Sequence, residues 1–187
     1  IFIGVDPASS ENVKADYTAI IVIGVDKDWN FYTIDLYRGQ VAPMDGANKI
    51  LEFADKYLPK AINIEETGHV MLQDYIRRVC KQTGRFYSIN PKKAIKAKYY
   101  RIKQLEPYFS SKAVFLKHEH YDLEQELLAF REHGTFKKDT LDALRWSIDD
   151  VFPPSVDQMD DGVYYQPQTQ VITDWQTGQV LTGMVHA

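Results

Sequence analysis

Three carboxylates stand at the ends of predicted structural elements, where they could together bind divalent metal. Asp6 ends one apolar strand pattern, Glu65 ends another at 61–64, and Asp139 opens an amphipathic helical stretch at 139–149. Acidic side chains gathered in one place repel each other, so we expect that only divalent cations hold such a cluster together. The three acids are therefore a candidate catalytic and metal-binding set.

Each acid also has a structural explanation. Asp6 precedes Pro7 and could shape a turn, and Glu65 could be a solvated charge after a strand. Asp139 could cap a helix, with Asp142 at the third helical position completing a pair that resembles a capping box. The chemical interpretation rests on the joint placement of the acids.

The type of ligand indicates the type of metal. Hard cations such as Mg²⁺ and Mn²⁺ prefer carboxylate oxygens, and no set of cysteines and histidines has zinc spacing. Two such ions can activate water and stabilise the leaving oxygen during phosphodiester hydrolysis. In this scheme Asp6 would bridge the ions, Glu65 would bind one, and Asp139 would bind the other.

Charge is distributed unevenly along the chain. The net charge of −4 does not indicate nucleic-acid binding, but residues 92–103 carry six lysines and arginines and no acid. Such a segment attracts phosphate, although a solvated helix face would have the same composition.

Within that segment, two basic residues are the best candidates for DNA contact. Lys98 and Arg101 lie three residues apart, on one face of a predicted helix, and we expect them to contact DNA phosphates. Packing, or an ion pair with Glu106, is the alternative. The weaker candidates for the same groove are Lys92, Lys93 and Lys96.

Composition bounds the remaining possibilities. The 187 residues, 44% of them apolar, suffice for one packed domain, and the single cysteine, Cys80, excludes an internal disulfide. No stretch approaches the roughly 20 apolar residues that span a bilayer, and the start does not resemble a signal peptide. A chain that opens in strand residues without a methionine suggests an excised or processed domain.

The pattern of elements predicts an α/β fold. Strands are expected at 1–6, 18–25, 31–37, 61–65, 86–89 and 113–116, and helices at 44–57, 68–83, 95–109, 121–131 and 139–151. Three antiparallel strands followed by alternating helices and strands are the order of an RNase H-like mixed sheet flanked by helices. The strands at 1–6 and 61–65 should then be parallel neighbours, which brings Asp6 and Glu65 to one edge of the sheet.

Two regions differ in composition. We expect the nuclease-like core to span 1–152 and the remainder, 153–187, to form a polar C-terminal extension. Apolar runs at 171–175 and 179–184 flank a short turn, so this extension could be a hairpin or a flexible tail.

An ordered set of segments resembles the nuclease domain of the large terminase subunit of tailed bacteriophages. The matching segments are Ile3–Ala8, Ala15–Ala19, Ile62–Gly68, Lys98–Ile102 with Leu105 and Pro107, and Asp139–Leu144. Together they span about residues 1–150. The resemblance implies an RNase H-like, metal-dependent endonuclease that cuts double-stranded viral DNA at the start and end of genome packaging. It also implies a preceding packaging ATPase domain, a small terminase subunit and a portal as partners, and the host cytoplasm as location.

The resemblance assigns roles to individual residues. Asp6, Glu65 and Asp139 correspond to the metal-binding acids, and Asp142 assists or replaces Asp139. Asp16 matches a supporting acid that could orient the loop between the first two strands. Relatives often have His-Asp-Asp where this chain has Lys-Asp-Thr at 138–140, so one candidate acid is absent or displaced. His133 lies close by in sequence and could be a ligand, although a loop histidine is more often solvated.

Other functions share many of these features. A junction resolvase or a nuclease of RNA–DNA hybrids would have the same fold, and a non-catalytic DNA-binding or assembly module would use its acids only for capping and solvation. No base-reading motif indicates a preferred cleavage sequence.

Overall fold

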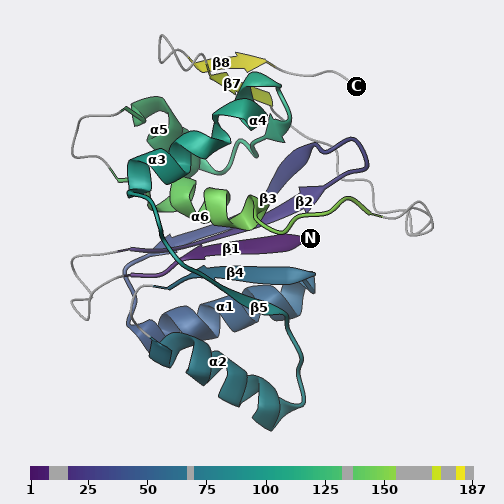
Figure 1. The fold of residues 1–187 in the computed structure, drawn as a ribbon, viewed down its shortest axis with the longest axis vertical. Coiled ribbons are helices and arrows are strands. Elements are labelled where there is room, and N and C mark those ends of the chain that lie inside the picture. The colour runs from purple at the N-terminus through teal and green to yellow at the C-terminus, as the bar shows by residue number, and fades with distance from the viewer. Residues whose placement is uncertain (9–16, 67–69, 132–136, 155–169, 174–179, 184–187) are drawn as a thin grey trace.

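The chain forms a mixed β-sheet with helices packed on both of its faces (Figure 1). This computed structural model describes residues 1–8, 17–66, 70–131, 137–154, 170–173 and 180–183. The strands are β1 (Phe2–Asp6), β2 (Thr18–Val25), β3 (Phe31–Gly39), β4 (Ala61–Glu65), β5 (Ile89–Lys92), β6 (Val114–Phe115), β7 (Gln170–Thr173) and β8 (Val180–Gly183). The helices are α1 (Pro43–Tyr57), α2 (Val70–Thr83), α3 (Lys98–Ile102), the 3₁₀ turn η1 (Lys103–Leu105), α4 (Glu106–Ser110), α5 (Tyr121–Ala129) and α6 (Asp139–Ile148).

The strand order confirms the predicted RNase H-like arrangement. Along the sheet the strands follow the order β5-β4-β1-β2-β3-β6-β7-β8. The first three strands are antiparallel neighbours, whereas β4 pairs with β1 in parallel. In that register Val5 lies opposite Ile64, so Asp6 and Glu65 follow at the same edge of the sheet. The expected parallel pairing of these two strands is confirmed.

Alternation along β1 divides the hydrophobic core between the two faces of the sheet. Ile3 and Val5 pack in the cluster that lies beneath α1 and α2, whereas Phe2 belongs to the cluster on the opposite face, with residues of α6. Successive side chains of a strand point to opposite faces, so Asp6 shares the face of Phe2 and Gly4. This parity directs Asp6 toward α6.

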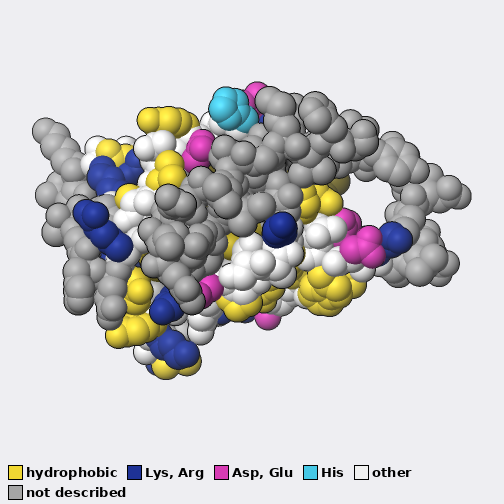
Figure 2. Space-filling view, turned by 90° about the horizontal axis from the view of Figure 1, so that it is seen from above, with side chains coloured by type: hydrophobic (Ala, Val, Ile, Leu, Met, Phe, Trp, Pro, Cys, Tyr) yellow, Lys and Arg dark blue, Asp and Glu magenta, His cyan; other side chains and the backbone are white. Residues whose placement is uncertain are grey.

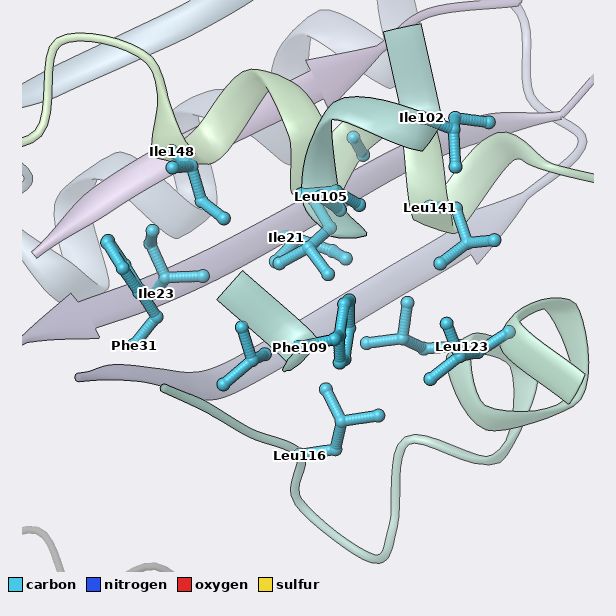
Figure 3. Close-up of a cluster of buried hydrophobic side chains, with 14 of the residues drawn as sticks. Ile21, Ile23, Phe31, Ile102, Leu105, Phe109, Leu116, Leu123, Leu141 and Ile148 are labelled. Carbon is cyan, nitrogen blue, oxygen red and sulfur yellow. The ribbon is translucent and has the colours of Figure 1, made fainter. Parts of the chain in front are cut away.

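Helix α6 lies directly on the sheet, over β1 and β2. Leu141 and Ile148 of α6 pack among Ile21 and Ile23 of β2, in the cluster drawn in Figure 3. The close approach to β1 requires a glycine, because a Cβ added at Gly4 would lie only 2.8 Å from Ser147 Cα and nearer still to Ala143 O.

Both ends of α6 are held by side chains from other elements. At its N-terminus, Glu126 Oε2 of α5 accepts hydrogen bonds from Thr140 N (2.8 Å), Thr140 Oγ1 (2.6 Å) and Leu141 N (3.1 Å). At its C-terminus, the buried Asn63 Nδ2 of β4 donates to Trp146 O (2.9 Å) and Asp149 O (2.7 Å). The position and rotation of this helix are therefore set by tertiary contacts at each end.

Asp139 does not cap α6, which was the structural alternative to a metal-binding role. The residue at the N-cap of α6 is Lys138, which forms no side-chain cap, and Asp139 is the first helical residue. Glu126, which is distant in sequence, satisfies the free N–H groups that a local cap would otherwise serve.

Two predicted elements are wrong in their bounds. The strand expected at 86–89 instead covers Ile89–Lys92, because parallel pairing with β4 places Ile62 opposite Ile89 and Glu65 opposite Lys92. Phe86 is left 93% exposed. β5 is an edge strand, which tolerates Pro91. The single helix expected at 95–109 is divided into α3, η1 and α4, and Pro107, which lacks a backbone N–H, stands in the first turn of α4.

Part of the C-terminal extension joins the sheet. β7 and β8 pair antiparallel, and Gln170 of β7 pairs with Phe115 of β6. Most of the rest of 153–187 lies outside the described residues. Among the described helices, none is both long enough and apolar enough to cross a membrane.

Candidate active site

Three buried carboxylates converge where β1, β4 and α6 meet. Asp6 ends β1, Glu65 ends β4, and Asp142 lies in the first turn of α6. One oxygen of each lies within 4.8 Å of the others. The three residues are 5%, 9% and 0% exposed, respectively. The predicted meeting of Asp6 and Glu65 therefore occurs, with an acid from the last helix as the third member.

The third member of this group is Asp142, whereas Asp139 lies at its margin. Asp139 Oδ1 is 3.1 Å from Lys98 Nζ, and its Oδ2 is 3.7 Å from Arg38 Nη2. Asp139 is thus held between two cationic side chains, and Asp142, almost one helical turn further on, projects into the cluster.

The face of α6 that carries Asp142 is covered. Asp142 has no exposed surface, because α3 covers this part of α6 and supplies the basic partners of the carboxylate. Trp146, which shares this face, is also buried.

Two basic side chains of α3 are ion-paired with the cluster. Lys98 Nζ lies 2.7 Å from Asp6 Oδ2 and 3.8 Å from Asp142 Oδ2, in addition to its contact with Asp139. Arg101 Nη2 lies 2.9 Å from Glu65 Oε1 and also pairs with Asp142. The expectation that only divalent metal could hold the acids together is therefore wrong.

Burial nevertheless leaves the cluster electrostatically unfavourable. Desolvation raises the pKa of Asp6 well above its ordinary value, and the neighbouring Asp142 and Glu65 act in the same direction, against the lowering effect of Lys98. Desolvation also raises the pKa of Asp142, although Arg101 and Lys98 oppose it. For Lys98 itself, burial lowers the pKa, but Asp6, Asp142 and Asp139 outweigh burial and raise it. Additional positive charge in this pocket would stabilise the ionised carboxylates.

This geometry occurs in a chain whose sequence matches a known family along most of its length. Residues 3–150 match the family model described as the terminase RNase H-like domain. The chain belongs to this family. The match spans β1 to α6 and so includes Asp6, Glu65, Asp139 and Asp142. The terminase domain is thus an RNase H-like nuclease domain by family and by strand order.

Solved structures similar to the terminase domain include two proteins in complex with Holliday junctions. T. thermophilus RuvC in complex with a Holliday junction substrate has 11% sequence identity and a TM-score of 0.43, covering 78% of this chain and 89% of that chain. The fowlpox virus resolvase in complex with Holliday junction DNA has 13% identity and a TM-score of 0.48, covering 79% and 95%. No curated protein matches the sequence.

The carboxylate cluster of the terminase domain fits a hard divalent cation. All three converging ligands are oxygens, they come from rigid elements, and their burial is unfavourable without positive charge. Asp6, Glu65 and Asp142 are the residues that would hold such an ion.

The remaining predicted residues lie in different environments. Lys92 pairs with Asp149 (3.7 Å) and Asp150, outside the carboxylate cluster. Lys93 and Lys96 are exposed, and so is Lys103, which the sequence pattern does not single out although it ends the same basic segment. Asp16 and His133 lie outside the described residues.

The contacts of two basic residues, Arg38 and Arg101, could not be fully predicted from their spacing in the sequence. Arg38 of β3 lies 3.5 Å from Glu126 Oε1 as well as near Asp139, which links the cap of α6 to the margin of the site. Arg101 also donates to Lys96 O (3.0 Å) and lies over the Trp146 ring, 5.2 Å from its centroid. The sequence signals for Arg101 are the basic segment 92–103, the spacing from Lys98 and the terminase-like segment, whereas Arg38 gives none.

Proposed function

We propose that this terminase domain is a metal-dependent endonuclease that hydrolyses phosphodiester bonds of double-stranded viral DNA during genome packaging. The observation that carries the proposal is the convergence of buried Asp6, Glu65 and Asp142 in a domain of the terminase RNase H-like family. Packaging in the host cytoplasm, together with an ATPase domain, a small terminase subunit and a portal, is the context that membership of this family supports.

The proposed cofactor is Mg²⁺ or Mn²⁺, with two ions engaged at cleavage. Bound divalent ions would supply the positive charge that activates water and stabilises the leaving oxygen. Asp6 would be shared between the ions, because it is the acid that lies beside both Glu65 and the Lys98-Asp139 pair. Asp142 is the better candidate for the third ligand, and Asp139 is the candidate for the outer position.

Arg101 would act as a positioning residue. Its guanidinium bridges Glu65 and Asp142 and is itself held by Lys96 O and the Trp146 ring. A planar guanidinium with several fixed donors keeps two carboxylates in a defined orientation.

An outer basic surface would bind the DNA backbone. Lys96 and Lys103 line a shallow pocket together with Tyr100, and Lys93 is exposed on the same segment. No ion pair of these three lysines occurs among the described residues, which leaves them available to phosphate oxygens. Lysine and arginine side chains gather toward the left-hand end of the face shown in Figure 2, the side on which α3 lies in Figure 1.

A cleavage assay tests the proposal. Supercoiled plasmid should be nicked and linearised in Mn²⁺ or Mg²⁺ and left intact when a chelator is present. Asp6→Asn and Asp142→Asn should each abolish cutting, whereas Asp74→Asn, the same change on an exposed residue of α2, should leave it unchanged. A folded protein that cuts under neither metal would favour the non-catalytic binding module.

The same assay separates the two candidate third ligands and the competing substrates. If Asp142 holds the inner position, Asp142→Asn abolishes cutting in Mn²⁺, whereas Asp139→Asn retains part of it. The opposite order of the two variants would restore Asp139 as the inner ligand. Faster cleavage of four-way junctions or RNA–DNA hybrids than of linear duplex would favour a resolvase or a hybrid nuclease.

Salt dependence tests the DNA surface. Replacing Lys96 or Lys103 with methionine should weaken duplex binding and reduce the slope of log K against log salt by about 1 for each phosphate that the variant no longer neutralises. Lys81→Met, at an exposed residue in the last turn of α2, is the matched control. An unchanged slope in both test variants would exclude this surface.

A further inference from the structure

One ammonium group lies among carboxylates from two elements. Lys98 Nζ is 2.7 Å from Asp6 Oδ2 of β1, 3.1 Å from Asp139 Oδ1 and 3.8 Å from Asp142 Oδ2, the last two from α6. The side chain of Lys98 is 33% exposed, whereas that of Asp142 is fully buried. A cation shared by Asp6 and Asp139 would have to lie where this ammonium lies.

The two basic residues of the site are held differently. Arg101 has a buried guanidinium with partners beyond the acids, namely Lys96 O and the Trp146 ring. Lys98 contacts the acids through a single charged atom at the end of a flexible, partly exposed stem. Arg101 is therefore a fixed part of the site, whereas within the described residues the Lys98 ammonium has hydrogen bonds and ion pairs only with the acids.

Charge balance limits how much positive charge the cluster can take. Four carboxylates, those of Asp6, Glu65, Asp139 and Asp142, face Lys98 and Arg101, which leaves two net negative charges when all the groups are ionised. Arg38 also reaches Asp139 at 3.7 Å, but Asp122 and Glu126 share its charge. Two negative charges match one divalent ion, whereas a second ion would make the pocket net positive.

We propose that Lys98 occupies the second cation position of this site, so that the DNA-free domain binds one divalent ion and a second binds only when Lys98 leaves. This inference rests on the proposed metal-dependent nuclease function. A DNA phosphate near the site would give the released ammonium a new partner. The arrangement would prevent the two-ion site from assembling in the absence of DNA.

Counting bound ions tests the inference without any cleavage. Mn²⁺ is titrated into the DNA-free protein and the free ion is measured by electron paramagnetic resonance. Wild type should saturate at one ion. Lys98→Met and Lys98→Gln, which remove the charge, should each bind two, and Lys98→Arg, which keeps it, should bind one. Lys81→Met, at an exposed residue in the last turn of α2, is the matched control and should also bind one.

Failure of the inference about Lys98 can be distinguished from failure of the proposed nuclease function. Two ions in wild type, or one ion in both neutral variants, would overturn the role of Lys98 even if the protein cuts DNA with Mn²⁺. Failure of both neutral variants to fold would also overturn it, because Lys98 would then be a fixed structural cation like Arg101. A wild-type protein that neither binds Mn²⁺ nor cuts DNA would remove the nuclease proposal as well.

Discussion

Substituting Gly4 tests whether the position of α6 on the sheet builds the site. In Gly4→Ala, the new Cβ would lie 2.8 Å from Ser147 Cα and closer to Ser147 N and Ala143 O, all of them backbone atoms of α6. Favourable contacts between carbon atoms begin at roughly 3.5 Å, so the helix must withdraw from β1 by about 0.7 Å or more. Backbone atoms cannot rotate away as a side chain can.

The withdrawal should affect both stability and the site. Overpacking of a core costs about 1–3 kcal/mol, and we expect the upper end here because the obstruction is backbone. For a domain of this size, such a loss lowers Tm by roughly 6–12 °C. Asp142 moves with the helix, and catalytic geometry tolerates only about 0.5 Å of displacement. Mn²⁺ affinity and cleavage should therefore fall even at temperatures at which the variant is fully folded.

The assay is urea unfolding combined with Mn²⁺ titration at low temperature. Gly46→Ala in α1 is the matched control, since its Cβ would lie at least 3.7 Å from its neighbours, Thr18 and Val41. Alanine in the interior of a helix should raise the free energy of unfolding by about 0.5–1 kcal/mol. If Gly4→Ala unfolds at the same urea concentration as wild type and binds Mn²⁺ equally well, the close approach of α6 does not build the site.

Three further predictions concern two residues that hold α6 in place and the buried His120. Asn63→Leu should lower the free energy of unfolding by about 2–4 kcal/mol, because the buried carbonyl of Trp146 and the partly buried carbonyl of Asp149 each lose a donor. Glu126→Ala should cost about 2 kcal/mol through loss of the cap of α6, and Glu126→Gln should cost less because it retains an acceptor. Burial lowers the pKa of His120, so the unfolded chain takes up its proton first as pH falls. The contribution of neutral His120 to the free energy of unfolding is therefore complete above about pH 6.5, and it is lost as the pH falls from there through the pKa of His120 in the folded protein. His120→Gln should flatten this part of the pH profile of urea unfolding.

Each of these predictions has a result that would contradict it. Equal urea midpoints for Asn63→Leu and wild type would mean that water satisfies the carbonyls at the C-terminus of α6. Equal stability of Glu126→Ala and Glu126→Gln would assign the cap no energetic role. A pH profile unaltered by His120→Gln would mean that the histidine titrates alike in the folded and unfolded chains.

The sequence alone determined which strands end in candidate catalytic acids. Apolar runs that end in an acid placed Asp6 and Glu65, and the order of elements predicted the parallel pairing that brings these two residues together. Both inferences depend on local patterns and on general rules of connection, which a sequence expresses directly. The same rules failed at β5, where the register with β4 outweighed the apolar pattern at 86–89.

Only the tertiary structure decided which acid of the last helix enters the site. Periodicity shows which residues share a face of a helix, but the rotation of α6 depends on its contact with Gly4 and on Glu126 and Asn63 at its two ends. That rotation buries Asp142 and leaves Asp139 at the margin. The pairing of these acids with Lys98 and Arg101 is likewise a through-space property. Electrostatic energy depends on distance and burial, and neither can be read from separation along the chain.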